Sequence, residues 1–268
     1  MKGIHEYIVE ILEPLNAPSS YHTAQNNLPN FRLPSLATKA HISIIDDDGK
    51  SAQMNLFNFL HPLGVPFGVA IVPNWLNTSG FLTLEDVKYL RDNNVEILSH
   101  TMSHLNLSTQ SKEVQEFQIS GSKKWLESAG CAPSGFVLPY GGYTEETIRI
   151  ASKYYDSTYH YDNGDKIYTK NNIKNHWILR HSFDTGVQAL KNLIDTAVLN
   201  NGWLIIATHA ESYEWLPESY TNLSEIITYA NSVGAEFILP KDGFQIYGNL
   251  MESDNGNRIN SNCEFITG

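Results

Sequence analysis

The chain has 268 residues and a formal net charge of −11, and 41% of its residues are hydrophobic while 18% are charged. This composition excludes an intrinsically disordered chain, and the length fits one α/β barrel or two small domains, of which we favour one. Binding to a nucleic-acid backbone depends on Lys and Arg that displace counterions. The acidic balance therefore argues against a nucleic-acid partner and favours neutral or cationic substrates.

Cysteine usage and hydropathy bear on two further classes of protein. The two cysteines, Cys131 and Cys263, sit in no CxxC or Cys/His cluster, so we expect neither a disulfide framework nor a structural zinc knuckle. No segment approaches the roughly 20 apolar residues of a membrane span. Residues 1–16 mix acidic with apolar residues, unlike a signal peptide. Localisation stays open, and action outside a cell or on a virion is compatible with these features.

Three regions follow one another along the chain. Residues 1–36 are rich in Asn, Ser and Pro and predict an N-terminal arm. Residues 37–248 alternate apolar runs with amphipathic stretches and predict one folded domain built from βα units. Residues 249–268 predict a polar C-terminal tail or linker.

The expected elements of the middle region alternate in chain order. Strands are expected at residues 41–45, 68–72, 95–99, 135–138, 177–180, 203–208 and 236–238. Helices are expected at residues 51–60, 83–93, 111–129, 144–152, 186–200 and 223–232. Thr83 and Ser111 stand at predicted N-caps, and Gly130 and Gly234 at predicted C-caps. The alternation predicts an α/β fold, a distorted or incomplete (β/α) barrel of about seven parallel strands, with a doubly wound open sheet as the alternative.

Three consecutive carboxylates, Asp46, Asp47 and Asp48, come directly after the apolar run 42–45 and before Gly49. Carboxylates at the end of a buried strand repel one another and lose hydration unless a cation or hydrogen bonds offset the cost. Taken alone, the run fits a cation site and a solvated acidic turn equally well, because Asp and Gly also form turns.

Two histidines four residues apart, His100 and His104, follow the predicted strand 95–99. If the chain turns helically there, both imidazoles lie on one face and reach one metal ion. The pair alone also fits surface or core histidines. Two histidines and one aspartate from the ends of different strands make a stronger case, because three protein ligands and an open position are typical of catalytic zinc.

Two more features stand at the ends of predicted strands. The Pro-Tyr-Gly-Gly segment 139–142 fits an ordinary turn, or a turn whose backbone N–H groups stabilise an oxyanion. His209 follows the strand 203–208 and fits a structural histidine or a general acid. Because barrel active sites gather at the carboxyl ends of the strands, the four features predict one shared site.

These motifs, in this order, resemble those of the polysaccharide deacetylases, the chitin-deacetylase-like enzymes of carbohydrate esterase family four, over residues 37–247. The family's Thr-Phe-Asp-Asp-Gly motif looks like residues 45–49, and its His-Ser/Thr-x-x-His motif is matched by residues 100–104. Its Arg-Pro-Pro-Tyr-Gly motif looks like residues 137–141, and its late Leu-His motif is approximated by residues 208–209.

The resemblance implies a role for each matched residue. A divalent metal ion, zinc first with cobalt or nickel as alternatives, would be held by Asp48, His100 and His104. Asp47 would be the general base and His209 the general acid. The backbone N–H of Tyr140 would stabilise the oxyanion.

Two departures from the family pattern affect Asp47. Val137 stands where the family has an arginine that pairs with the base aspartate. Arg180 is a candidate replacement, with Asp184 as a candidate partner for it, and a structural or surface arginine is the alternative. Residues 45–46 read Ile-Asp instead of Thr-Phe, which leaves open which two aspartates act; the register set by Gly49 favours the last two.

The activity implied by the resemblance is metal-dependent removal of acetyl groups, N-acetyl first, from a polysaccharide or oligosaccharide. The alternatives are an amidohydrolase of a small non-sugar amide and a non-catalytic carbohydrate-binding module. Trp215, Tyr143 and Arg180 are the predicted substrate contacts, with Trp75 and Tyr213 as further loop aromatics. The polar ends are typical of one module of a larger surface-acting protein, such as a phage tail protein.

Overall fold

The structure is a computed structural model, and it describes residues 39–161, 166–169, 173, 176–210 and 217–248. The predicted N-terminal arm at 1–36 and the predicted tail at 249–268 lie outside the described residues. Trp215 and Tyr213 also lie outside them.

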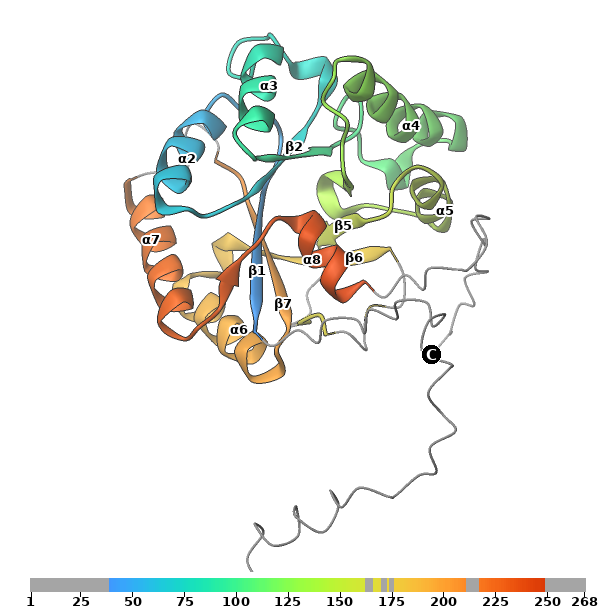
Figure 1. The fold of residues 1–268 in the computed structure, drawn as a ribbon. Helices are drawn as coiled ribbons and strands as arrows, with labels where there is room; N and C mark the ends of the chain where they lie inside the picture. The colour runs from blue at the N-terminus through green and yellow to red at the C-terminus, as the bar shows by residue number, and fades with distance from the viewer. Residues whose placement is uncertain (1–38, 162–165, 170–172, 174–175, 211–216, 249–268) are drawn as a thin grey trace, which may run out of the picture. The chain divides into compact units, whose positions relative to one another are not determined.

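Seven parallel strands form a closed barrel with helices around it (Figure 1). Each strand pairs with the next, and β1 pairs with both β7 and β2, which closes the ring. The strands are β1 (His41–Asp46), β2 (Gly68–Ile71), β3 (Glu96–Ser99), β4 (Phe136–Val137), β5 (Thr158–Tyr161), β6 (Trp177–Ser182) and β7 (Trp203–Thr208). The predicted α/β barrel of about seven parallel strands is confirmed.

The outer helices follow the strands as the βα pattern predicts, and they encircle the barrel in Figure 1. They are α2 (Gln53–Leu60), α3 (Leu84–Asp92), α4 (Lys112–Ser128), α5 (Glu145–Tyr154), α6 (Val187–Asn200) and α7 (Pro217–Ser232). Short 3-10 helices occupy several connections: η1 (His61–Leu63), η2 (Pro73–Trp75), η3 (Leu107–Thr109), η4 (Pro139–Gly141) and η5 (Phe183–Thr185).

The predicted caps define the ends of these helices. The Thr83 side chain accepts a hydrogen bond from the backbone N–H of Asp86 in a capping box, and the Ser111 side chain accepts one from Val114 N. Gly130 and Gly234 have φ angles of 78° and 80°, the left-handed conformation that ends a helix at little cost for glycine.

Three elements differ from the expectation. Strand β5 was not predicted, because its sequence Thr-Tyr-His-Tyr contains no aliphatic residue. Strand β8 (Glu236–Phe237), predicted as a barrel strand, lies outside the ring and pairs only with the first residues of β1. Helix α8 (Pro240–Tyr247) was also missed; it contains Gly243, where the Trp203 indole occupies the space that a Cβ would need.

Apolar side chains form one layer outside the barrel and another inside it. Alternate residues of a strand point to opposite faces, so Ile42 and Ile44 pack under the outer helices while Ile45 points into the barrel. The interior layer continues through Tyr159 and Trp203.

Helix α8 closes the amino-terminal end of the barrel. Phe244 and Tyr247 pack in the same cluster as Trp203, and the Tyr247 hydroxyl lies 3.1 Å from the carbonyl oxygen of Asn201. In Figure 1 α8 lies within the circle of outer helices. The carboxyl ends of the strands are therefore the end at which a site can open.

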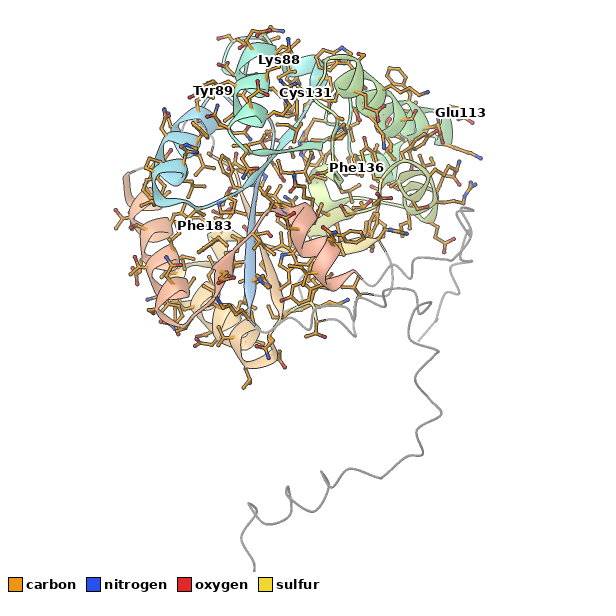
Figure 2. All side chains as sticks on the ribbon, viewed as in Figure 1. Lys88, Tyr89, Glu113, Cys131, Phe136 and Phe183 are labelled. Atoms are coloured by element: carbon orange, nitrogen blue, oxygen red, sulfur yellow. The ribbon has the colours of Figure 1, made fainter. Side chains whose placement is uncertain are left out.

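Figure 2 shows the side chains, with Cys131 labelled between α3 and α4 and with Lys88 and Tyr89 labelled on α3. Cys131 is a buried free thiol, whereas Tyr89 is 51% exposed. None of the helices in the described ranges has the length and apolar composition that crossing a membrane requires.

Candidate active site

Asp48, His100 and His104 converge beyond the carboxyl ends of β1 and β3. Their candidate ligand atoms all lie within 4.8 Å of one another. Asp48 Oδ1 lies 3.4 Å from His100 Nε2 and 3.1 Å from His104 Nε2. Zinc bond lengths of about 2.0–2.1 Å at tetrahedral angles separate neighbouring ligand atoms by about 3.3 Å. The distances from Asp48 Oδ1 to the two imidazole nitrogens therefore fit neighbouring ligands of a tetrahedral divalent ion.

The orientation of His100 is fixed by its second nitrogen. His100 Nδ1 lies 2.8 Å from the carbonyl oxygen of Val137. A carbonyl oxygen only accepts, so Nδ1 carries the proton and donates it, which leaves the lone pair of Nε2 free for a metal ion. Val137 thus contributes its backbone to the site, although it lacks the arginine side chain of the family motif.

The two histidines meet through a turn and not through the helix that we considered from their spacing. Thr101 and His104 have φ angles of 63° and 56°, which a right-handed helix does not contain. The Thr101 hydroxyl accepts a hydrogen bond of 2.9 Å from the backbone N–H of His104. This side-chain bond closes the turn and holds the second imidazole beside the first.

Backbone strain concentrates at this site. Asp48 and Tyr140 also have positive φ angles, 81° and 58°. Positive φ is uncommon outside glycine and is often found at functional sites, where the surrounding structure enforces it. Two glycines, Gly49 and Gly141, continue the same turns at φ angles of 69° and 66°.

Asp47 forms a buried ion pair with Arg180. The two guanidinium nitrogens Nη1 and Nη2 donate to Oδ1 and Oδ2 of Asp47 over 2.7 and 2.8 Å, and both residues are at most 1% exposed. Burial alone would raise the pKa of Asp47, but the charge and hydrogen bonds of Arg180 outweigh it and hold the pKa below its ordinary value. The chain thus supplies from β6 the arginine that Val137 does not supply from β4.

Arg180 is enclosed on its other sides as well. Its guanidinium carbon lies 4.7 Å from the centre of the Tyr161 ring, and its Nε is buried without a partner among the described residues. Asp184, the other partner considered for Arg180, is instead 3.3 Å from the Ser182 hydroxyl, which donates to it. Arg180 has no exposed surface and contacts Asp47, and its predicted direct contact with substrate stays a prediction.

Asp46 has neutral donors for partners. Gln53 Nε2 donates to Oδ1 over 2.7 Å, while the Thr208 hydroxyl and the Ala210 N–H donate to Oδ2 over 2.6 and 2.8 Å. Burial raises the pKa of Asp46 to about 6, although hydrogen bonds from Thr208, Gln53 and Ala210 oppose the rise. The three consecutive carboxylates thus have three different environments.

His209 approaches Asp47 from β7. Its Nε2 lies 3.7 Å from Asp47 Oδ2, and its side chain is 39% exposed. The ring stacks nearly parallel to Tyr161, with 6.3 Å between ring centres and 16° between ring planes. Asp47 therefore lies between a buried arginine and a solvent-accessible histidine.

Aromatic rings flank the second histidine. The His104 ring centre lies 4.8 Å from that of Trp75 and 4.6 Å from that of Tyr140, and Tyr140 is 68% exposed. Trp75 continues to Phe81, whose ring lies 4.5 Å from Lys50 Nζ. The sequence motif pointed only to the Tyr140 backbone; the exposed ring was missed, although a turn rich in glycine indicates exposure.

Tyr143 lies elsewhere. Its ring contacts Trp177 and His160, at centre distances of 4.9 and 6.0 Å. His160 alternates with Tyr159 along β5, and Tyr159 points into the barrel, so this group covers the outer side of the strand. The substrate contact predicted for Tyr143 stays a prediction.

Several contributors to the site have no motif of their own. Gln53, Thr208 and Tyr161 all contact the aspartates or their partners, and all three are buried or partly buried. Thr208 could be anticipated from its place before His209, but nothing in the sequence indicated the other two.

Comparison with known proteins shows what the domain is similar to. Residues 37–156 match the family model described as polysaccharide deacetylase. YxkH of Bacillus subtilis (strain 168), which carries the provisional name of polysaccharide deacetylase, is 24% identical over 154 residues, or 57% of this chain and 52% of the relative. The chain thus spans about half the length of that curated relative.

Two solved structures share the barrel. A family 4 acetyl xylan esterase from Clostridium thermocellum, in complex with a cobalt ion, has a TM-score of 0.54 at 19% identity, with 78% of this chain and 92% of that chain covered. A family four carbohydrate esterase pseudoenzyme from Bacillus anthracis has a TM-score of 0.56 at 16% identity, with 77% and 66% covered. Residues 37–156 are therefore similar to the polysaccharide deacetylase family, and the chain has the distorted barrel of the family four carbohydrate esterases.

Proposed function

We propose that this protein is a metal-dependent hydrolase that removes acetyl groups, N-acetyl first, from a carbohydrate. The observation that carries the proposal is the position of Asp47. Its carboxylate is held by Arg180, faces His209, and directly precedes Asp48 of the candidate metal group. A proton acceptor, a proton donor and a metal site thus lie close together, as metal-assisted amide hydrolysis requires.

Asp48, His100 and His104 would hold the metal ion, and zinc, cobalt and nickel all suit two imidazoles and a carboxylate. The ion, when bound, polarises the acetyl oxygen and acidifies a water molecule. The cobalt ion in the related acetyl xylan esterase supports a divalent metal at this fold's site.

Asp47 would take the proton from the attacking water. Because Arg180 keeps its pKa low, Asp47 stays ionised at neutral pH and holds one fixed orientation. A carboxylate of low pKa is a weak base, so it accepts a proton efficiently only from an acidic water. The backbone N–H of Tyr140 would donate to the oxyanion that develops on the acetyl oxygen.

His209 would donate its proton to the leaving nitrogen as the C–N bond breaks. Its Nε2 lies 3.7 Å from Asp47 Oδ2, and its side chain is 39% exposed, so the ring can face the substrate. The products are acetate and a free amine. A binding module has no need of such a proton-transfer pair, so the pair favours catalysis over the non-catalytic alternative. The related pseudoenzyme is an example of the non-catalytic alternative on the same fold.

The rings beside His104 support a carbohydrate as the proposed substrate. Trp75 and the exposed Tyr140 offer apolar faces next to the metal group, and such faces suit the C–H side of a sugar ring. The names of the related deacetylase and acetyl xylan esterase point the same way.

Acetate release from a panel of acetylated glycans tests the proposal, with and without a chelator, for the wild type and Asp47→Asn. We expect activity that the chelator removes and zinc restores, and a loss of about 10²- to 10⁴-fold in Asp47→Asn. Asp92→Asn, which changes an exposed carboxylate on α3, is the matched control.

Calorimetric zinc titration accompanies the assay, and we expect Asp47→Asn to bind zinc as the wild type does. Full activity in the chelated protein would contradict the metal mechanism. Inert glycans with stoichiometric zinc and cleavage of a small amide would favour the amidohydrolase alternative. No hydrolysis of any substrate would favour the binding module.

A further inference from the structure

Asp46 is the last residue of β1, two residues before the candidate metal ligand Asp48, and it binds the segment that carries His209. One of its oxygens, Oδ2, accepts from the Thr208 hydroxyl and from the Ala210 N–H. These two donors belong to the residues immediately before and after His209. A single buried carboxylate oxygen therefore binds the chain on both sides of the imidazole.

The backbone pairing of β1 with β7 does not by itself position the chain around His209. The pairing of β1 with β7 ends where Asp46 faces Thr208, and the backbone N–H of Asp47 donates to Thr208 O over 3.0 Å. Ala210 lies beyond that last rung. Its bond to Asp46 Oδ2 therefore directs the chain after the strand has ended, and that direction determines where the His209 side chain starts.

Gln53 fixes the carboxylate from the other side. Its Nε2 donates to Asp46 Oδ1 over 2.7 Å and to the carbonyl oxygen of Asp47 over 2.8 Å, and Gln53 is fully buried. With both oxygens engaged and no exposed surface, Asp46 has no atom to offer to a metal ion or a substrate. It is a carboxylate whose contacts are all internal.

A buried carboxylate costs free energy that a buried apolar residue does not. The family motif resembled by residues 45–49 has an apolar phenylalanine where this chain has Asp46. We propose that Asp46 is a positioning residue for His209, which keeps the imidazole beside Asp47 by binding the residues on both sides of it. This inference rests on the proposed function, because it assigns to Asp46 the placement of the proton donor.

Thr208→Val and Thr208→Ser form a matched pair of variants. Valine has nearly the shape of threonine but cannot donate to Asp46, whereas serine keeps the hydroxyl. Asp46→Leu removes the acceptor for both bonds. We expect kcat for an N-acetylated sugar to fall about 10-fold in Thr208→Val and about 10²-fold in Asp46→Leu, with Thr208→Ser close to the wild type.

Hydrolysis of an aryl acetate distinguishes a positioning role of Asp46 from general damage to the site. Its phenolate leaves without protonation, so a displaced acid should not slow its hydrolysis. We expect the variants to retain aryl acetate hydrolysis within a few-fold, and Asp46→Leu to add no loss in a His209→Ala background, since residues that act as one unit are not additive. Equal losses on amide and ester, or a further loss in that background, would overturn the inference.

A measurement independent of turnover distinguishes this inference from the proposed function. Backbone ¹⁵N relaxation at His209 and exchange of the Ala210 amide proton should both increase in Thr208→Val but not in Thr208→Ser, while zinc binding is unchanged. Unchanged dynamics in Thr208→Val would refute the positioning role even in a protein that cleaves nothing. An inactive wild type with these changes would count against the proposed function alone. If Asp46→Leu does not fold, the Thr208 pair decides.

Discussion

At the amino end of the barrel Glu96 is buried against neutral donors, whereas at the carboxyl end Asp47 is buried against a guanidinium. Glu96 is 5% exposed and accepts from the Ser134 hydroxyl and from the backbone N–H of Lys241 in the first turn of α8. Asp47 is 1% exposed and receives both donors from Arg180.

The same degree of burial gives opposite pKa shifts. Burial raises the pKa of Glu96 from 4.5 to about 7, because its hydrogen bonds only partly offset the lost hydration. The full charge of Arg180 reverses the shift at Asp47. The partner, and not the depth of burial, therefore decides which carboxylate stays ionised. The end that closes the barrel tolerates a carboxyl group that is partly protonated near neutral pH, while the end that carries the site holds one that is charged.

Replacing Arg180, the partner of Asp47, should have the largest effect on stability and activity. Arg180→Met leaves Asp47 buried without its counter-charge, and breaking a buried pair in this way costs about 3–5 kcal/mol. We expect the free energy of unfolding at pH 7, measured in urea, to fall by that amount and acetate release to be lost. Arg149→Met, which removes an exposed arginine on α5, should have little effect and serves as the control.

The sign of the pH dependence gives a second check on Arg180→Met. In the wild type the lowered pKa of Asp47 contributes stability above its ordinary pKa, and this contribution is lost as the pH falls through the lower folded value. In the variant, burial raises the pKa, so protonation at low pH relieves the unpaired charge. The deficit of Arg180→Met should therefore shrink on acidification, and a deficit that is constant from pH 7 to pH 4 would contradict this account.

Replacing Glu96 should have a smaller effect at the opposite end. A folded pKa raised from 4.5 to about 7 means that the stabilising contribution is complete below pH 4.5 and is lost as the pH rises through 7. Glu96→Gln resembles the protonated acid and keeps an acceptor for Lys241 N. We expect the stability of the variant relative to the wild type to improve by roughly 3 kcal/mol between pH 4 and pH 8. A pH-independent difference would show that Glu96 titrates normally.

The sequence predicted the barrel, but it did not predict which partners the buried carboxylates at its two ends would have. The aliphatic runs of β1 and β7 predicted both strands to within one residue, and their alternation with amphipathic segments predicted the fold. Strand β5 was missed because its inward residues, Tyr159 and Tyr161, are aromatic and its outward ones polar. Helix α8 was missed because Pro240 and Gly243 are weak helix signals that only packing against Trp203 explains.

For the site, the sequence indicated single residues and not their pairings. Asp48, His100 and His104 stand in local motifs, so their meeting could be expected from parallel strands that end at one edge. The contact of Arg180 with Asp47 joins residues 133 positions apart, and it depends on the closure of the barrel. From the sequence, Arg180 was only a candidate partner of Asp47, and a structural or surface role was equally open. A side-chain contact across a barrel produces no periodic pattern in the sequence.

The exposed ring of Tyr140, which lies beside His104 at the carboxyl end of the barrel, should give the smallest effect. Tyr140→Ala removes a ring that is 68% exposed, so we expect little change in stability. Loss of one stacking contact should raise KM for an acetylated oligosaccharide roughly 3- to 10-fold, with kcat nearly unchanged, because the ring would bind substrate and transition state alike. Tyr89→Ala, which removes a similarly exposed tyrosine from α3, is the control and should leave KM unchanged. A fall in kcat without a change in KM would instead assign the Tyr140 ring to the shaping of the turn whose N–H is proposed to meet the oxyanion.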